Sequence, residues 1–366
     1  MSDMQEIILD STNKMFKSLC TKELIDRSEE GIFAEELWSV LVESGVTSVG
    51  VPESLGGTGG DYNDALHILQ LAGKFSVPLP LAETLMVQWL LADHGISPSS
   101  EILTLSVNPK NKIELEETPK GYSVQGKAVN VPWARHAKRI VVIANVEGKS
   151  KLALLPLDKA NIEFNSNLAG EPSDTIHFQS VDVADIFLEE VDVEQFRMKV
   201  TNLGGLIKIV MMSGAMEALL ELSVLFSKER EQFGRPLHRL QAIQQHIAVL
   251  SGETVASVTI ANKAILAFGK GVDDHEIAAA KLKVNEAAGK VTEIAHQLHG
   301  AIGVTHEHRL NQVTRRLWAW RDEFGNENYW ADQLADKVMN SNTESLWEMI
   351  TDHPVIAKVQ LGEGIK

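Results

Sequence analysis

Residues 229–237 form a short charged segment that is suited to hold an anion. The guanidinium of Arg230 can bind a phosphate bidentately, because it presents a planar fork of hydrogen-bond donors. Gly234 permits backbone angles that other residues avoid, and Pro236 suits the first turn of a helix. The segment therefore predicts a charged break between two helices, the second of which opens at Pro236.

The residues on both sides of this break have the spacing of buried helices. From about residue 204 to 228, apolar side chains recur at steps of three and four, which places them on one helical face. After Pro236 the same spacing continues through Leu240, Ile243 and Ile247. Two long helices are thus expected to position the arginine.

A second block, residues 297–307, reads Gln-Leu-His-Gly-Ala-Ile-Gly-Val-Thr-His-Glu. Together with Arg-x-Gln-Phe-Gly-x-Pro-Leu at 230–237, and in this order and separation, it resembles the C-terminal signatures of the acyl-CoA dehydrogenases. Ala301 stands where the family's Gln-x-x-Gly-Gly-x-Gly block has its second glycine. The resemblance extends over nearly the whole chain.

The resemblance implies that these two blocks bind the pyrophosphate and adenosine part of an FAD whose flavin ring lies in a neighbouring subunit. Arg230 would neutralise phosphate charge, while Gln232 and Gln297 would donate amide hydrogens. Glycines would let the backbone approach the cofactor closely. The implied cofactor-binding residues are Arg230, Gln232, Phe233, Gln241, Gln297, Gly300 and Gly303.

The catalytic base of the family has no counterpart at its usual positions. The family reaction needs an ionised carboxylate that takes the α-proton of an acyl-CoA, while the β-hydrogen leaves as hydride to FAD. In most members that position corresponds to Phe324, and in some to Gly204, and neither can accept a proton. Glu323 and Glu327 flank the first position and are the candidates for a displaced base, although neighbours on a turn are expected to point elsewhere.

The flavin-ring motifs of the family are missing as well. Residues 105–112 contain neither Thr-Glu-Pro nor Gly-Ser-Asp, and Trp133 alone resembles the family's third ring-contacting motif. Trp133 reads equally well as a core or edge aromatic. The chain therefore retains the half-site for a partner's cofactor and lacks the half-site for its own.

This division predicts the base-lacking subunit of an α2β2 heterotetrameric acyl-CoA dehydrogenase, of the type that acts on steroid side chains. The resemblance implies a paralogous subunit as partner, an acyl-CoA substrate and electron-transfer flavoprotein as the electron acceptor. Two alternatives stay open. One is a self-sufficient homotetramer with a displaced base, and the other is a flavin-free scaffold or binding protein on the same fold.

The spacing patterns predict an α+β protein with three regions. Residues 1–98 read as an N-terminal helical domain, with Asp61 as the N-cap of a helix that runs to about residue 76. The glycine-rich stretch 56–60 before it lacks the Lys-Ser/Thr ending of a phosphate loop. Residues 99–197 read as an antiparallel β domain or barrel, and residues 198–366 as a four-helix bundle.

Composition narrows the class of partner. The chain has 366 residues and a net charge of −16, which argues against nucleic acid or an anionic membrane as the main partner. We find no apolar run as long as a membrane span, and the single cysteine, Cys20, fits a reducing compartment, so we expect a cytoplasmic protein.

Two further clusters combine residue types that could bind a metal or stack on aromatic rings. The histidines at 296, 299, 306 and 308 lack the His-Glu-x-x-His spacing of a zinc site, so no metal is expected. Arginines at 315, 316 and 321 lie beside Trp318 and Trp320, which favours cation–π packing at a subunit interface.

Overall fold

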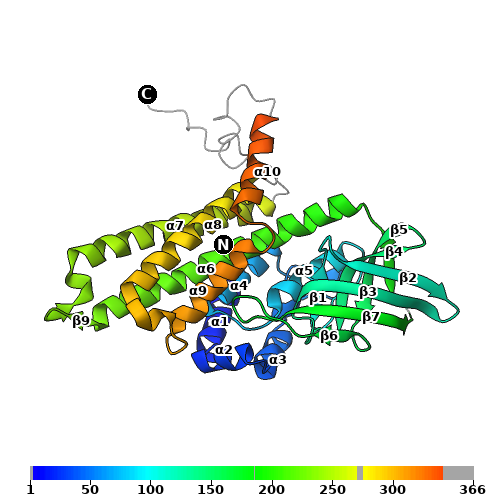
Figure 1. Ribbon diagram of the computed structural model, residues 1–366, viewed down its shortest axis with the longest axis horizontal. Helices are drawn as coiled ribbons and strands as arrows, with labels where there is room; N and C mark the ends of the chain where they lie inside the picture. Colours follow the sequence, from blue (N-terminus) through cyan, green and yellow to red (C-terminus); the bar gives the residue numbers. More distant parts are fainter. Residues whose placement is uncertain (1–2, 185, 270–274, 341–366) are drawn as a thin grey trace.

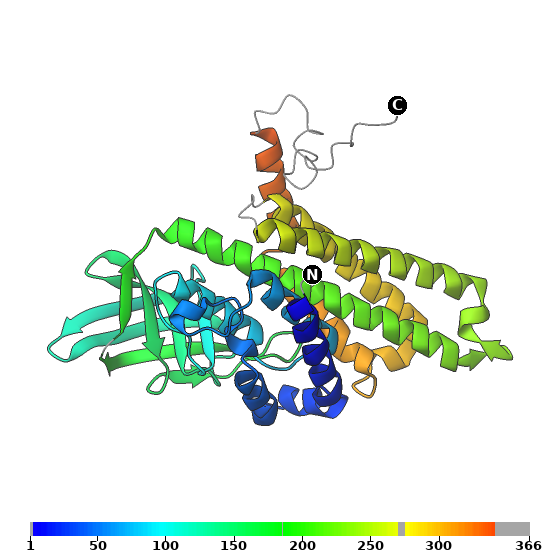
Figure 2. The same cartoon turned by 180° about the vertical axis from the view of Figure 1, so that it is seen from behind.

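The computed structural model describes residues 3–184, 186–269 and 275–340. Helices come first along the chain, then a sheet, then helices again, as the sequence predicted. Figure 1 shows the sheet at one end of the molecule and the C-terminal helices at the other, with the N-terminal helices between them. Figure 2 shows the same arrangement from behind.

The N-terminal region is helical, and one of its helices is capped by two residues that are close in sequence. The carboxylate of Asp61 accepts a hydrogen bond from the backbone N–H of Asp64 at 3.0 Å, and the Asp64 carboxylate accepts one from the Asp61 N–H at 3.1 Å. This reciprocal pair confirms the predicted N-cap. The helices are α1 (Asp3–Leu19), α2 (Lys22–Glu29), α3 (Glu35–Glu43), α4 (Tyr62–Phe75) and α5 (Leu81–Ala92).

The sheet has the order β6-β7-β3-β2-β4-β5-β8, with β1 added on β4. It is mixed, so the prediction of an antiparallel domain or barrel is wrong in two pairings, β1–β4 and β2–β4, which are parallel. The cause is that β2 and β4 are each the first strand of an antiparallel hairpin and lie side by side. The strands are β1 (Leu103–Ser106), β2 (Lys112–Thr118), β3 (Gly121–Pro132), β4 (Arg139–Val146), β5 (Lys149–Pro156), β6 (Asn161–Glu163), β7 (Ser173–Val183) and β8 (Phe187–Glu190).

The C-terminal region is built on α6 (Val193–Glu229), which packs against most of the other helices of the bundle. Its N-cap is Asp192, so the predicted domain boundary at 197/198 falls inside this helix. An 18-residue window of α6 reaches a mean hydropathy of 1.7, enough for a membrane span, so the expectation that no apolar run has this length is wrong. Of that window, 61% is buried inside the protein. The other helices are α7 (Gln241–Phe268), α8 (His275–His299), α9 (Arg309–Asp322) and α10 (Glu327–Met339).

Two glycines bring α6 close to α4. A Cβ added to Gly73 would lie 1.9 Å from the carbonyl oxygen of Met211, and one added to Gly214 would lie 1.9 Å from that of Gln70. The two backbones thus approach more closely than any side chain would allow. This crossing fixes α6 against the N-terminal helices, and with it the residues that α6 presents to the rest of the chain.

The charged break between α6 and α7 is a β-hairpin rather than the start of a helix. Strands β9 (Glu231–Gln232) and β10 (Arg235–Pro236) pair antiparallel, and Phe233 and Gly234 close the turn with φ angles of 55° and 75°. Two consecutive positive φ angles are typical of a tight hairpin turn. Pro236 therefore lies in a strand and precedes a 3-10 turn at Leu237–Arg239, and α7 begins at Gln241.

Candidate functional site

A cleft of about 770 Å³ lies between the sheet, the first half of α6 and the segment that follows α9. The sheet contributes the end of β1 and the end of β3, and the connection between β6 and β7 supplies a third wall. The lining residues that bear on its chemistry are Glu83, Asn167, Glu171, Lys208, Glu323 and Phe324.

The two positions that the resemblance assigns to the family's catalytic base pack against each other at the edge of this cleft, which Phe324 lines. A Cβ added to Gly204 would lie 2.4 Å from ring carbons of Phe324, so the phenyl ring rests against the α6 backbone. The glycine is what makes room for the ring. No carboxylate can be introduced at Gly204 unless Phe324 moves, so the two substitutions form one packed unit.

Lys281 and Trp330 hold the loop that carries Phe324 through hydrogen bonds to its backbone. Phe324 and Gly325 have φ angles of 54° and 106°, an uncommon conformation for a phenylalanine. The Lys281 ammonium donates to the carbonyl oxygens of Trp320, Arg321 and Gly325 at 3.1–3.3 Å. The indole N–H of Trp330 donates to the carbonyl oxygens of Phe324 and Gly325, both at 3.1 Å. These contacts fix the ring in the cleft.

A buried ion pair lies one helical turn beyond Gly204. The ammonium of Lys208, which is 3% exposed, is 2.8 Å from a carboxylate oxygen of Glu323 and 3.7 Å from one of Glu83. Burial by itself would lower the pKa of Lys208, but the two carboxylates outweigh burial and raise it. Burial raises the pKa of Glu83, and Lys208 offsets only part of that rise. The lysine is therefore a permanent cation that two carboxyl groups share.

The two candidate displaced bases differ in position. Glu323 lines the cleft, so the expectation that it points elsewhere is wrong for this residue. Its other carboxylate oxygen accepts a hydrogen bond from Asn167 at 3.2 Å. Glu327 is outside the lining of this cleft, begins α10 and forms an ion pair with Arg321.

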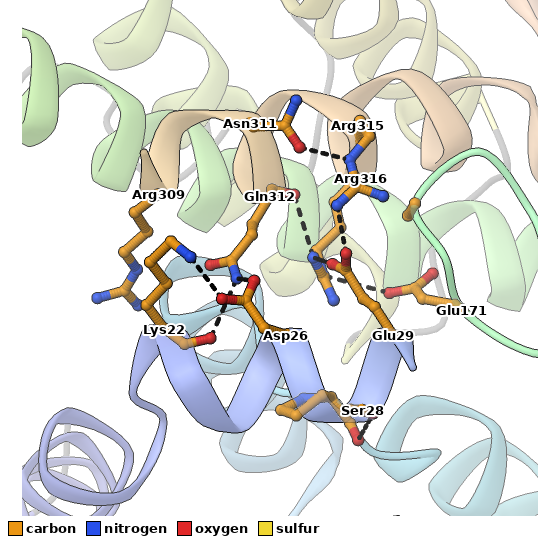
Figure 3. A network of polar contacts seen from close by, with 12 residues as sticks. Lys22, Asp26, Ser28, Glu29, Glu171, Arg309, Asn311, Gln312, Arg315 and Arg316 are labelled. Atoms are coloured by element: carbon orange, nitrogen blue, oxygen red, sulfur yellow. Dashed lines mark hydrogen bonds and ion pairs between the residues drawn. The ribbon is translucent and has the colours of Figure 1, made fainter. Parts of the chain in front are cut away.

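A line of polar contacts leads from the cleft to the N-terminal helices. The Asn167 side chain bridges Glu323 and Glu171, and a carboxylate oxygen of Glu171 is 3.4 Å from the Nε of Arg316. Figure 3 shows how Arg316 and its neighbour Arg315 both reach Glu29 on α2. These arginines are thus paired within the chain, and the expected cation–π role at an interface is wrong for Arg315 and Arg316. In the described part of the chain, the cation over the Trp320 ring is Lys208, at 5.5 Å from the ring centroid.

The predicted cofactor-binding residues lie at the far end of the bundle. Arg230 ends α6, and Gln232 and Phe233 belong to the hairpin, where Phe233 is 86% exposed. Over the described ranges, the Arg230 guanidinium is exposed and has no ion-pair partner. Gln241, the first residue of α7, is exposed as well.

The second block lies at the same end. Gln297 and Gly300 are exposed, and nothing lies within 4 Å of a Cβ placed on Gly300. Gly303 is buried against Leu310. The ring of Phe226 on α6 stacks on His299 at 4.4 Å between centroids, which ties the end of α8 to the base of the hairpin. The structure thus brings both blocks to one tip of the bundle, with their donors facing outward.

The histidines near the end of α8 have structural contacts. His296 stacks on Trp318 at 5.4 Å, and His299 bonds the carbonyl oxygen of Ala295 at 2.8 Å. Burial lowers the pKa of both histidines.

The region in which the family's flavin-ring motifs are missing borders the cleft. Residues 105–109 and Trp133 line it, and Trp133 is buried with a φ of 54°. Sequence reasoning missed Lys208, Glu83, Asn167 and Glu171 altogether. The lysine had a signal, because it stands alone in a long apolar run of α6. Its partners gave no such signal in the sequence, since they come from α5 and from two loops.

Comparison with known proteins agrees with the geometry. The profile "Acyl-CoA dehydrogenase, C-terminal domain" matches residues 198–339, and "Acyl-CoA dehydrogenase, N-terminal domain" matches residues 2–97. Among curated relatives, "Acyl-CoA dehydrogenase IpdE2" of Mycolicibacterium smegmatis is 24% identical over 319 residues, which are 86% of this chain and 93% of that protein.

Solved structures show the same fold. The ChsE4–ChsE5 complex from Mycobacterium tuberculosis matches with a TM-score of 0.78 at 20% identity, over 94% of this chain and 99% of that one. A variant of the Tcur3481–Tcur3483 steroid ACAD matches with a TM-score of 0.80 at 20% identity, over 92% of this chain and 98% of that one. With both terminal domains matched and the fold shared along the chain, this protein belongs to the acyl-CoA dehydrogenase family.

Proposed function

We propose that this chain is the base-lacking subunit of a heteromeric, FAD-dependent acyl-CoA dehydrogenase. The observation that carries the proposal is the contact between Gly204 and Phe324. A base must reach the α-carbon of the substrate in its ionised form, and neither residue has an ionisable group. The phenyl ring also fills the space that a carboxylate from Gly204 would need.

The tip of the bundle supports a role toward a cofactor held by a neighbour. FAD would supply the hydride acceptor when bound. Arg230 would hold its pyrophosphate, and Gln232 and Gln297 would donate hydrogen bonds beside it. The exposed guanidinium, which has no ion-pair partner in the described part of the chain, suits an anion that arrives from outside. Phe233 would pack on the ribose or adenine, and Gln241, Gly300 and Gly303 would complete the site.

The outer face of α7 supports a partner subunit. Val249, Val255 and Leu266 are 42–58% exposed on this helix, where a second subunit would cover them. We infer a paralogous subunit in an α2β2 assembly, a steroid-type acyl-CoA as its substrate and electron-transfer flavoprotein as its acceptor. Names of structural neighbours, a two-component complex and a steroid ACAD, point the same way. We place this assembly in the cytoplasm, which the lone, buried Cys20 supports.

Co-expression tests this proposal. The chain would be purified alone and together with a paralogue that carries the missing glutamate, and flavin absorbance and acyl-CoA oxidation would be measured for both. We expect a colourless, inactive chain alone and a yellow, active complex. Stoichiometric FAD and turnover in the chain alone would overturn the proposal, and a complex that stays colourless would favour a flavin-free scaffold.

A second candidate rests on the position of Glu323. Its carboxylate lines the cleft and lies 2.8 Å from the Lys208 ammonium. A self-sufficient enzyme with a displaced base would lose turnover in Glu323→Gln while it kept its flavin colour. Glu327→Gln, which changes a carboxylate outside the cleft lining, is the matched control.

A further inference from the structure

A cluster of three rings lies under the tip of the bundle, the end at which Figure 1 labels β9. The Phe226 ring, near the end of α6, stacks on His299 at 4.4 Å between centroids with an interplanar angle of 28°. The ring of His308, the N-cap of α9, is 4.9 Å from that of His299 and 6.1 Å from that of Phe226. The ends of α6 and α8 and the start of α9 therefore meet at one contact.

The His299 side chain is 5% exposed, and its own helix fixes its orientation. The Nδ1 atom bonds the carbonyl oxygen of Ala295, one turn earlier, at 2.8 Å. A carbonyl oxygen only accepts, so Nδ1 carries a proton. Burial lowers the pKa of this imidazole below its usual 6.5, which favours the neutral ring. A neutral ring stacks on Phe226 without the cost of a buried charge.

The Phe226 ring is connected to the arginine block through the backbone. Its carbonyl oxygen accepts a hydrogen bond from the Arg230 N–H at 2.9 Å, at the end of α6. The carbonyl oxygen of Arg230 in turn accepts one from the Leu237 N–H at 2.9 Å, which closes the hairpin. A shift of α6 at Phe226 would therefore move Arg230 and the hairpin with it.

His299 itself belongs to the second block. It is the last residue of α8, two positions after Gln297, and Gly300 follows it with a φ of 64°. This left-handed turn lets the chain fold back. A Cβ added to Gly303 would lie 2.9 Å from the Cβ of His299, so the block packs on this residue. The contact between His299 and Phe226 thus joins one block directly to the helix that carries the other.

We propose that His299 is the positioning residue of the cofactor site, because its ring contact with Phe226 sets the separation of the two blocks and thereby their affinity for FAD. The inference rests on the proposed function, which assigns both blocks to the pyrophosphate and adenosine part of a partner's FAD. His299 acts through the backbone that carries the donors. Donors that are already held at the required spacing lose less conformational freedom on binding, which raises affinity.

Flavin binding by the complex with a paralogue tests this inference. His299→Asn keeps a donor for the Ala295 carbonyl but removes the ring, and should weaken FAD binding by about 2- to 10-fold, the factor that corresponds to one aromatic pair. His299→Phe keeps a ring without the donor and should retain the natural affinity. Phe268→Ala is the control, because it removes a ring contact with Tyr62 at the other end of α7 and should leave FAD affinity as it is.

Hydrogen exchange on the chain alone gives a measurement that needs no FAD. In His299→Asn the Arg230 and Leu237 amides, whose hydrogen bonds hold the hairpin, should exchange several-fold faster than in the natural chain. In His299→Phe they should exchange at the natural rate. Phe226→Leu removes the other ring of the pair and should repeat the effects of His299→Asn, even if His299→Asn fails to fold.

Three results would each overturn the inference. They are equal FAD affinities of His299→Asn and His299→Phe, equal weakening by Phe268→Ala, and hairpin exchange that neither His299→Asn nor Phe226→Leu accelerates. A natural complex that binds no FAD would overturn the proposed function instead, while the exchange rates would still decide whether His299 positions the tip.

Discussion

The cleft and the tip of the bundle differ in how their charged side chains are paired. In the cleft, Lys208 is buried against two carboxyl groups, and Phe324 packs on Gly204. At the tip, Arg230 and Gln232 face solvent on a hairpin, and the arginine has no ion-pair partner among the described residues. Side chains that pair with one another stabilise a fold, whereas exposed hydrogen-bond donors without a protein partner can bind a ligand. Under the proposed function, this comparison means that packing takes the place of the family's chemistry in the cleft, whereas the tip keeps a surface for the cofactor.

The largest effect expected from this comparison is on stability. Lys208→Met leaves Glu323 and Glu83 without their cation, and an uncompensated buried charge costs about 3–5 kcal/mol. Lys199→Met, on the same helix, removes a half-exposed partner of Asp93 and should cost about 1 kcal/mol or less. Denaturant unfolding of both variants measures the difference, and equal losses would contradict the buried pair.

The contact between Gly204 and Phe324 predicts a smaller loss. Gly204→Ala places a Cβ 2.4 Å from ring carbons, and overpacking of this kind costs about 1–3 kcal/mol. Combined with Phe324→Ala, the substitution should cost less than the sum of the two, because the ring is then gone. Gly252→Ala on α7, where a Cβ meets nothing within 4 Å, should stabilise the helix by about 0.5–1 kcal/mol. Additive losses in the unfolding cycle would show that the ring and the glycine are independent.

The tip predicts an effect on binding with little effect on folding. Arg230→Ala in the complex with a paralogue should weaken FAD binding by about 1.5–3 kcal/mol, the range for a hydrogen bond to a charged group. Its stability should change by about 0.5 kcal/mol at most, since the side chain is exposed. Flavin release on dilution measures the first quantity. Arg235→Ala, on β10 of the adjoining hairpin, is the control. Equal weakening by both variants would mean that Arg230 acts only through its charge.

Sequence reasoning predicted the order of the regions and the Asp61 cap correctly, because each depends on local spacing. The assignment of Phe324 and Gly204 to the base positions stays a prediction from motif position. It placed the start of α7 at Pro236, since glycine and proline mark a hairpin turn as readily as a helix start. It missed the parallel pairings, which depend on how two hairpins dock. The ion pair of Lys208 was hidden for a similar reason, since its partners come from α5 and a distant loop.

The smallest expected effect is the contribution of Glu83 to the pH dependence of stability. Burial raises the pKa of this carboxyl above its usual value of 4.5, so the folded chain keeps a proton that the unfolded chain releases. The free energy of unfolding is therefore highest below pH 4.5 and falls as pH rises through the raised pKa. The loss is about 1.4 kcal/mol for each tenfold difference in proton affinity between the folded and unfolded chains. Glu83→Gln should remove this loss, so its advantage over the natural chain should grow as pH rises above 4.5 when both are unfolded with denaturant. Glu116→Gln, on the exposed side of β2, should follow the natural chain throughout. If Glu83→Gln also runs parallel to the natural chain, then Lys208 compensates both carboxylates fully.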